Sequence, residues 1–318
     1  MKSHVSPTPS SLSVSFVEKE AIRTRLIDAG AVAVGFAKAE EVEPGAVDFF
    51  NQWIERGDNA GMDYMHNYPD LRRDPRLLLD DAKTIISLAF SFAQPRLRPA
   101  NIGYIAQYAY GKDYHKELRK IILPIIKSLE DRYGAKSRVC IDSAPIMERY
   151  WAQKAGIGFT ADNGALIVPQ AGSMVFLAEI ITTLEITPDL PMKRECDHCG
   201  LCRNSCPGNA IKENGTIDAR QCLSYLTIEH HGPFTNNLNT LEISGNIIFG
   251  CDRCLTNCPH NQHPAPIRVE TLLPSDQMLS ITSEDFMQMN STDFDKQFST
   301  SPLRRSGLSA LQRNIRSL

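Results

Sequence analysis

The residues of this sequence with the most specific chemistry are cysteines that fall into two similarly spaced groups. In each group, cysteines separated by two residues are followed, three residues later, by a cysteine that precedes proline. The first group is Cys196, Cys199, Cys202 and Cys206, and the second, interrupted group is Cys222, Cys251, Cys254 and Cys258. Thiolates at this spacing hold iron–sulfur clusters, so the pattern predicts a protein that transfers electrons one at a time.

We expect the two groups to exchange one ligand. In two-cluster ferredoxins the fourth cysteine of a motif binds the cluster of the other motif. The first cluster would then be held by Cys196, Cys199, Cys202 and Cys258, and the second by Cys206, Cys222, Cys251 and Cys254. The alternative is a pair of structural zinc sites, but zinc ligands usually come in pairs separated by a longer loop. The remaining cysteine, Cys140, has apolar neighbours and is predicted to be a small core residue.

Hydrophobic periodicity predicts the elements that must position these residues. Helical spacing occurs in residues 15–29, 47–54, 113–133 and 145–155, and apolar runs at 31–36, 84–92, 137–142, 165–168 and 174–183 indicate strands. This alternation predicts an α/β or α+β architecture. We expect a disordered tail at 1–14, an α/β domain at 15–190, a ferredoxin-type domain at 191–265 and a helical tail at 266–318. Two helices of that tail should begin at the capping patterns Thr282-x-x-Asp285 and Thr292-x-x-Asp295.

Composition excludes several classes of protein. The chain has 318 residues, of which 42% are hydrophobic and 22% charged, so it is neither disordered nor fibrous. Its net charge of -3 argues against a general nucleic-acid coat, although a local basic surface remains compatible with it. The sequence shows neither a secretory signal nor an apolar run of about eighteen residues. We therefore expect a cytoplasmic monomer with reduced thiols and no membrane contact.

Further motifs lie outside the cysteine groups, at residues 72–75, 84–88, 108–115, 142–145, 148–149, 155–158, 172–179, 222–229 and 301–305. Together they resemble the epoxyqueuosine reductase family over roughly residues 15–318. The string at 222–229, Cys-Leu-Ser-Tyr-Leu-Thr-Ile-Glu, is especially specific because a simple ferredoxin has no need of it. The resemblance implies an α+β protein, with an α/β cobalamin-binding domain like that of reductive dehalogenases followed by a bacterial-type two-cluster ferredoxin domain.

The resemblance also implies an activity. Members of this family reduce epoxyqueuosine to queuosine at the wobble position of tRNA, with cob(II)alamin and two [4Fe–4S] clusters as cofactors and an external low-potential electron donor. The opening epoxide oxygen needs a proton, which a carboxylic acid with a raised pKa can supply. By resemblance this donor is Asp142. Its position between a strand and a helix that opens with Pro145 is equally typical of a helix cap.

The cobalamin contacts that we expect from the resemblance come from many parts of the chain. They are Met65, Ile105, Tyr108, Asp142, Asn163, Ser173, Ser224, Tyr225, Phe249 and Gly250. A cobalt-binding D-x-H-x-x-G motif is absent, and Asp113 of the similar stretch 113–118 is predicted to be a helix cap. Arg149 of the helix after Asp142 is expected to be a solvated surface residue.

One departure from the family pattern is Asp162, which stands where the family usually has lysine. Four arginines near the C-terminus are candidate contacts to tRNA phosphates, namely Arg304, Arg305, Arg313 and Arg316. Two other functions remain open from the sequence. One is a cobalamin-dependent reductase of a small molecule, and the other is a pure electron-transfer protein. A nicotinamide partner is unsupported because no G-x-G-x-x-G follows a strand.

Overall fold

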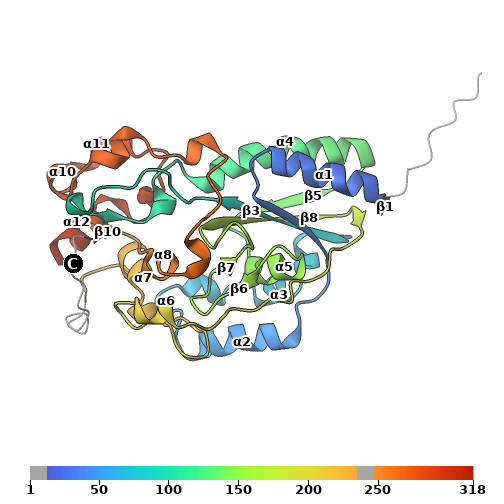
Figure 1. Cartoon of the computed structure of the whole chain (residues 1–318), viewed down its shortest axis with the longest axis horizontal. Coiled ribbons are helices and arrows are strands. Elements are labelled where there is room, and N and C mark those ends of the chain that lie inside the picture. The colour runs from blue at the N-terminus through green and yellow to red at the C-terminus, as the bar shows by residue number, and fades with distance from the viewer. Residues whose placement is uncertain (1–12, 235–246, 318) are drawn as a thin grey trace, which may run out of the picture.

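The computed structural model describes residues 13–234 and 247–317. Within these ranges a sheet domain, a segment with the clustered cysteines and a set of C-terminal helices lie side by side (Figure 1). The predicted α+β architecture is confirmed. Residues 1–12 of the expected tail lie outside the described ranges, and strand β1 (Ser13–Val14) pairs with β9 (Glu185–Ile186). No helix of the described ranges is both long enough and apolar enough to cross a membrane.

The central sheet has four antiparallel strands. Their order is β2 (Ala33–Lys38), β3 (Thr84–Ser91), β8 (Val175–Thr182) and β5 (Ser137–Cys140). Every residue of β3 is buried, as its unbroken apolar run predicted, because the sheet is covered on both faces. Cys140 is buried at the end of β5, so its predicted role as a core residue is confirmed.

Helices cover the two faces of the sheet. Helices α1 (Phe16–Asp28) and α4 (Tyr114–Tyr133) lie on one face, and α2 (Pro44–Glu55), α3 (Pro69–Arg73) and α5 (Glu148–Lys154) on the other (Figure 1). Because side chains alternate along a strand, Ile86 joins the core under α1 and α4, whereas neighbouring Ile85 packs with Trp151 of α5. The predicted cap Asp113 is confirmed, since its side chain accepts the His115 amide hydrogen.

The described residues of the cysteine segment, 191–234 and 247–265, contain little regular structure. Their α-helices are α6 (Leu201–Asn204), α7 (Leu223–Ile228) and α8 (Arg253–Thr256), and the segment lies against the hairpin of β6 (Phe159–Thr160) and β7 (Leu166–Ile167). Its strand β10 (Ile247–Phe249) pairs with β4 (Tyr104–Ile105) of the sheet domain. Neither β4 nor β10 was predicted, because strands of two or three residues carry no detectable periodicity.

The C-terminal residues form helices α9 (Asp276–Ser280), α10 (Ser283–Gln288), α11 (Ser291–Gln297) and α12 (Gly307–Ser317). The capping box of Thr282 and Asp285 is confirmed. The second predicted cap is wrong by two residues, because Asn290 rather than Thr292 caps α11 by accepting the amide hydrogen of Asp293. Asparagine is at least as good an N-cap as threonine, so α11 begins after Asn290 rather than after Thr292.

The C-terminal helices share a core with both other parts of the chain. This core combines residues of the sheet domain, of β10 and of the C-terminal helices, among them Ile105, Phe249, Phe286 and Leu311. The buried side chain of Asn314 donates to the backbone oxygens of Thr227 in α7 and Ile248 in β10, at 2.9 Å each. These contacts fix α7 and β10 relative to the sheet domain.

Candidate functional site

The structure brings the clustered cysteines together in two groups of four. One pocket is lined by Cys196, Cys199, Cys202 and Cys258. The thiol of Cys254 interacts electrostatically with those of Cys251, Cys222 and Cys206. Each group thus contains the fourth cysteine of the other sequence motif, which is the ligand exchange that two-cluster ferredoxins show.

The chemistry of these groups fits iron–sulfur clusters. Burial raises the pKa of Cys251 to about 11, so its thiol keeps its proton until a metal replaces it. Cys196 and Cys258 pack against an apolar cluster of Phe159, Ala161 and Ile167. Four soft sulfur donors in a partly apolar setting suit iron–sulfur ligation.

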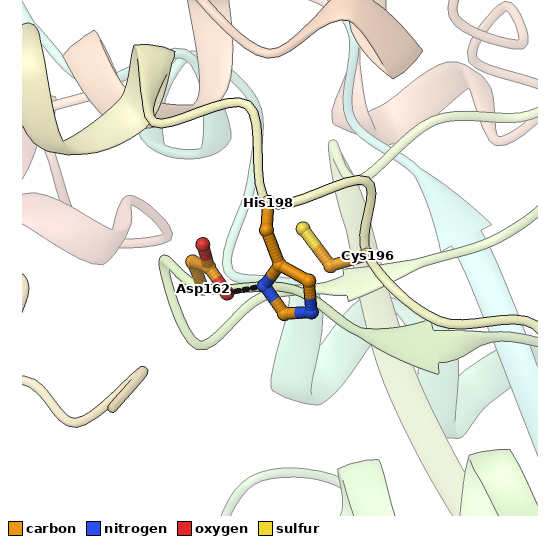
Figure 2. A group of neighbouring side chains, drawn as sticks. All are labelled: Asp162, Cys196 and His198. Atoms are coloured by element: carbon orange, nitrogen blue, oxygen red, sulfur yellow. Dashed lines mark hydrogen bonds and ion pairs between the residues drawn. The ribbon is translucent and has the colours of Figure 1, made fainter. Parts of the chain in front are cut away.

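Asp162, where the family usually has lysine, lies beside the first group (Figure 2). It is buried, and its Oδ1 accepts a hydrogen bond of 2.7 Å from Nδ1 of His198, a residue between Cys196 and Cys199. The ligand atoms of Asp162, Cys196 and His198 lie within 4.8 Å of one another. Asp162 therefore contributes a buried acceptor that orients the first cysteine loop, in a place where a lysine could not accept a hydrogen bond.

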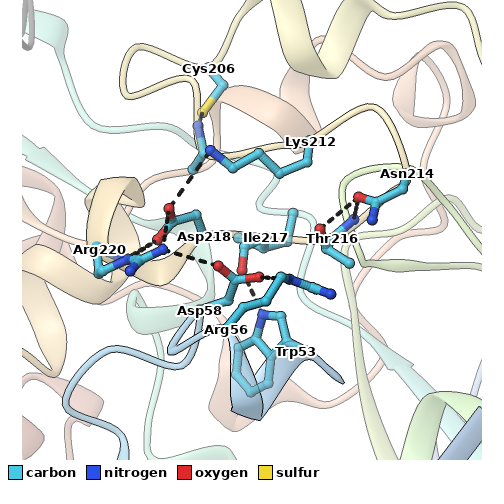
Figure 3. Close-up of polar contacts among 11 residues, drawn as sticks. Trp53, Arg56, Asp58, Cys206, Lys212, Asn214, Thr216, Ile217, Asp218 and Arg220 are labelled. Atoms are coloured by element: carbon cyan, nitrogen blue, oxygen red, sulfur yellow. Dashed lines mark hydrogen bonds and ion pairs between the residues drawn. The ribbon is translucent and has the colours of Figure 1, made fainter. Parts of the chain in front are cut away.

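A polar network fixes the cysteine segment to the loop after α2 (Figure 3). The carboxylate of Asp58, with only 5% of the residue exposed, accepts from Arg56 at 2.8 Å and from Arg220 at 3.1 Å. The indole of Trp53 donates to the backbone oxygen of Ile217 at 2.7 Å. Arg220 lies two residues before Cys222, so this network positions a cysteine of the second group.

Helix α7 brings two predicted cofactor contacts towards the sheet domain. The hydroxyl of Tyr225 accepts the amide hydrogen of Gly61 at 2.9 Å, and a Cβ atom at Gly61 would lie only 2.8 Å from that hydroxyl. Glycine at 61 thus permits the close approach. Met65 lies in the short helix that follows, Asp63–His66, and Ser224 precedes Tyr225 in α7.

Asp142 lies directly after β5, in a left-handed backbone conformation with φ of 50°. The hydroxyl of Tyr114 donates to Asp142 Oδ2 at 2.5 Å, and His115 Nε2 lies 3.5 Å from the same oxygen. The Asp142 side chain is nevertheless 57% exposed. It is therefore held in place by two donors while one side stays accessible to a reacting group.

His115 lies between two carboxylates. Its Nδ1 donates to Asp113 Oδ1 at 2.8 Å, and its Nε2 faces Asp142. Although burial opposes the charge, these two carboxylates raise the pKa of His115 to about 9. The imidazole is therefore protonated at neutral pH.

The expectation of a raised pKa for Asp142 is wrong for this structure. Burial does raise the pKa of this carboxyl, but the hydrogen bonds from His115 and Tyr114 lower it further, and the net shift is downward. Burial and the neighbouring Asp142 raise the pKa of Tyr114, so its hydroxyl remains a donor. The proton available to this site at neutral pH is consequently on His115 rather than on Asp142.

Charged and aromatic groups from distant segments surround the exposed side of Asp142. Arg305 donates to Glu229 at 2.6 Å and lies over the ring of Tyr64, 6.0 Å from its centroid. Both Arg305 and Tyr64 also interact electrostatically with Asp142. Residues from three segments that are distant in the sequence thus lie near the accessible side of Asp142.

The other predicted cobalamin contacts lie at different depths. Ile105 and Phe249 are fully buried, backbone included, in the pairing of β4 with β10. Gly250 donates its amide hydrogen to Thr227 at 2.9 Å. The ring of Tyr108 lies between those of Phe249 and Tyr114, with centroid distances of 6.0 and 6.4 Å, and thus connects this layer to Asp142.

Asn163 and Ser173 instead meet the cysteine segment. Asn163 donates to the backbone oxygen of Cys254 at 3.2 Å. Ser173 exchanges hydrogen bonds with the Asn261 side chain, donating its amide hydrogen at 2.7 Å and accepting at its hydroxyl at 2.8 Å. Both residues therefore lie at the boundary between the sheet domain and the cluster cysteines.

Two arginines make hydrogen bonds to backbone oxygens that were not predicted. Arg149 has an exposed side chain, as predicted, but its guanidinium also donates to the backbone oxygen of Gly164. Arg313 is half-buried and donates to three backbone oxygens, those of Leu226, His230 and Gly232. Arg313 thus supports α7 and the loop after it.

Sequence reasoning missed the proton donors of the site. Tyr114 and His115 follow the helix cap Asp113, and we had interpreted this stretch only as a helix start. Residues 108–115, which include Tyr114 and His115, carry part of the family resemblance, and this was the signal in the sequence that the two residues have a function. Their contact with Asp142, 28 residues from Tyr114, depends on how α4 packs beside β5.

The fold and the site together define a class of iron–sulfur protein with an α+β domain in front of its cluster cysteines. Residues 195–261 match the family described as 4Fe-4S double cluster binding domain, and residues 72–143 match the family described as Epoxyqueuosine reductase QueG, DUF1730.

Full-length relatives point the same way. The chain is 36% identical over 312 residues to the epoxyqueuosine reductase of Cyclobacterium marinum, covering 95% of this chain and 97% of the relative. It is 33% identical over 298 residues to that of Cellulophaga algicola, covering 92% and 95%. A crystal structure of epoxyqueuosine reductase with an epoxyqueuosine-modified tRNA-Tyr stem loop superposes with a TM-score of 0.85, at 26% identity, covering 93% of this chain and 79% of that one. The chain belongs to the epoxyqueuosine reductase family.

Proposed function

We propose that this protein reduces epoxyqueuosine to queuosine at the wobble position of tRNA, with cobalamin and two [4Fe–4S] clusters as cofactors. The observation that carries this proposal is the placement of Asp142. Its carboxylate is bound by Tyr114 and lies next to a protonated His115, and its side chain remains accessible near Arg305 and Tyr64.

The reaction balances as an epoxide plus two electrons and two protons giving an alkene and water. When bound, cobalamin supplies a strongly reducing, nucleophilic cobalt, and the two clusters deliver electrons to it singly. The residues of the chain supply the protons and exclude water. Asp142, His115 and Tyr114, which would handle the protons, lie together in the structure.

Asp142 delivers a proton to the epoxide oxygen in this proposal. The proton reaches Asp142 Oδ2 from His115 Nε2, 3.5 Å away, while Asp113 stabilises the imidazolium from its other side. Tyr114 holds the same oxygen with its hydroxyl and so orients the carboxyl group. A carboxyl group assisted in this way acts as a general acid even though its own pKa is low.

We assign Cys196, Cys199, Cys202 and Cys258 to one cluster and Cys206, Cys222, Cys251 and Cys254 to the other. The pocket and the thiol interactions described above support this assignment. Cobalamin would be held by residues facing Asp142, with Met65, Tyr108, Ser224 and Tyr225 as the accessible candidates. Ile105, Phe249, Gly250, Asn163 and Ser173 complete the proposed contacts.

The proposed substrate is a tRNA anticodon loop that carries epoxyqueuosine. An enzyme that acts on a base takes it out of its stack, so the wobble base leaves the stack to reach the accessible side of Asp142. Arg305 lies near this side, and Arg304 next to it is half-exposed, so both are candidates to meet the phosphates. We further propose that the protein works in the cytoplasm, as a monomer, with an external low-potential electron donor.

The test is anaerobic reduction of epoxyqueuosine in a tRNA stem loop by protein reconstituted with iron, sulfide and cobalamin. The nucleoside product is measured by mass spectrometry. Asp142→Asn should retain the iron content and the cobalamin absorption but turn over about 10²–10⁴-fold more slowly. Persistence of epoxyqueuosine with the reduced wild-type protein would overturn the proposed function, and turnover of small halogenated or epoxide substrates would then favour a small-molecule reductase.

A further inference from the structure

The backbone of Asp142 needs a support that its side chain does not provide. Its φ of 50° lies in the left-handed region, which a non-glycine residue adopts only when its surroundings compensate the cost. The Asp142 amide hydrogen is donated to Oε1 of Glu148 at 2.7 Å. This hydrogen bond acts directly on the backbone of the strained residue.

Glu148 is well placed to give such support. It is the first residue of α5, which packs across β2, β3 and β8 of the central sheet. The loop between β5 and α5 contains no regular secondary structure, so no ladder or helix hydrogen bond holds the Asp142 backbone. The Glu148 carboxyl group therefore ties the backbone of this loop to α5.

The surroundings of Glu148 favour its neutral form. Burial, and after it the negative charge of Asp142, raise the pKa of Glu148 to about 8, while Arg149 and His115 act in the opposite direction. From β8, the fully buried Glu179 faces the same region, and its pKa is raised by burial and by Glu148. A carboxylic acid keeps an acceptor oxygen when protonated, so Glu148 can hold the Asp142 amide without adding a negative charge beside Asp142.

Glu179 adds an independent sign that this region is built for uncharged carboxyl groups. Ser87 donates to Glu179 Oε2 at 2.5 Å, whereas Glu179 Oε1 has no hydrogen-bond partner among the described residues. An ionised carboxylate would be very costly there, because it would be desolvated and incompletely bonded. The partly buried Glu148 and the fully buried Glu179 are thus two neighbouring carboxyl groups whose surroundings raise their pKa values.

We propose that Glu148 is a positioning residue, whose carboxyl oxygen accepts the Asp142 amide hydrogen and thereby holds the Asp142 side chain against Tyr114 and His115. The proposal rests on the proposed function for its catalytic consequence, since it assumes that Asp142 delivers the proton. It does not require Glu148 to touch substrate or cofactor. It assigns to Glu148 the role of an acceptor, and not that of a charge.

Glutamine and alanine separate these roles. Glu148→Gln keeps an acceptor oxygen at the same distance from the backbone and removes the ionisable group, whereas Glu148→Ala removes the acceptor. Glu284→Ala is a matched control, because Glu284 also lies in the first turn of a short helix, α10, and is exposed. Iron content, cobalamin absorption and circular dichroism establish that each variant is folded and loaded.

The first readout is hydrogen–deuterium exchange of the Asp142 amide, which does not depend on turnover. Exchange should be about tenfold faster in Glu148→Ala than in the wild type, and within about threefold of it in Glu148→Gln and in Glu284→Ala. The second readout is reduction of the tRNA stem loop. In Glu148→Ala, kcat should fall about 10–100-fold with KM changed less than about threefold, and Glu148→Gln should restore most of the rate.

Unchanged exchange in Glu148→Ala, or equal loss of kcat in the alanine and glutamine variants, would overturn the positioning role. The two proposals fail separately. If the exchange rates follow the expected order but the wild-type protein leaves epoxyqueuosine intact, Glu148 still holds the loop and the proposed function is wrong. If the wild type turns over and exchange is insensitive to residue 148, the function stands and the role of Glu148 falls.

Discussion

Replacing His115 with glutamine tests whether this imidazolium stores the proton that Asp142 delivers. At pH 7 the imidazole, with a pKa of about 9, carries a proton, whereas the Asp142 carboxyl has a lowered pKa and is ionised. Without His115, Asp142 would have to bring its own proton. A carboxyl group with an ordinary pKa near 4 is protonated in only about one molecule in a thousand at pH 7. We therefore expect His115→Gln to react about 10²–10³-fold more slowly at pH 7.

The measurement is a single-turnover rate with pre-reduced enzyme and the tRNA stem loop, from pH 6 to pH 10. The wild-type rate should hold at low pH and fall as the pH rises through about 9, because His115 then loses its proton. The variant should lack this transition and should accelerate as the pH falls. His263→Gln, at an exposed histidine, is the control. A variant rate within about threefold of the wild type at pH 7, with the same alkaline transition, would refute the reasoning.

Further predictions concern stability and cluster binding. Because the pKa of His115 is raised above its ordinary value of 6.5, the ion pairs of His115 should stabilise the fold fully below pH 6.5 and no longer do so once the pH rises through about 9. The thermal midpoint of the wild type should therefore fall over this window more than that of His115→Gln. Cys222→Ser should lose one cluster and keep the other, seen by iron analysis and EPR; retention of both clusters would contradict the ligand assignment. Asp58→Ala should cost about 1–2 kcal/mol, because it removes a buried acceptor of Arg220 whose own side chain is half-exposed, and chemical denaturation would show this. Gly35→Ala should express poorly or unfold at a lower temperature, since its Cβ would lie 2.1 Å from the backbone oxygen of Ala155, the C-cap of α5; an unchanged midpoint would argue against this packing.

The parts of the fold that follow from local pattern were predictable. The unbroken apolar run of β3 and the helical spacing of α4 each identify a long element that is buried along its length or along one face. The cysteine spacing likewise indicates cluster chemistry because it is set within a few residues. The pairing of β4 with β10 was not predictable, since it joins strands of two and three residues that lie more than 140 residues apart in the sequence.

The proton chemistry of the site was only partly predictable. Asp142 was identified through resemblance, but its pKa depends on Tyr114 and His115, which α4 brings to it from another part of the chain. A pKa reports the balance between burial and hydrogen bonding, and sequence reveals neither quantity for a contact between distant residues. For the same reason, the sequence did not indicate that His198 would donate a hydrogen bond to Asp162, 36 residues away; in the structure the Nδ1 and Oδ1 atoms are 2.7 Å apart.

The pairing of β10 with β4, together with the hold of Asn314 on both α7 and β10, bears on how such a protein can be assembled from parts. A cluster-binding module joined only by a linker can be gained, lost or exchanged by a single recombination of genes. Here the module contributes a strand to its host, and the end of the chain closes over both. Grafting a foreign ferredoxin at this place would leave the backbone of β4 and the amide of Asn314 without partners, so the electron-supplying part and the reacting part must change together.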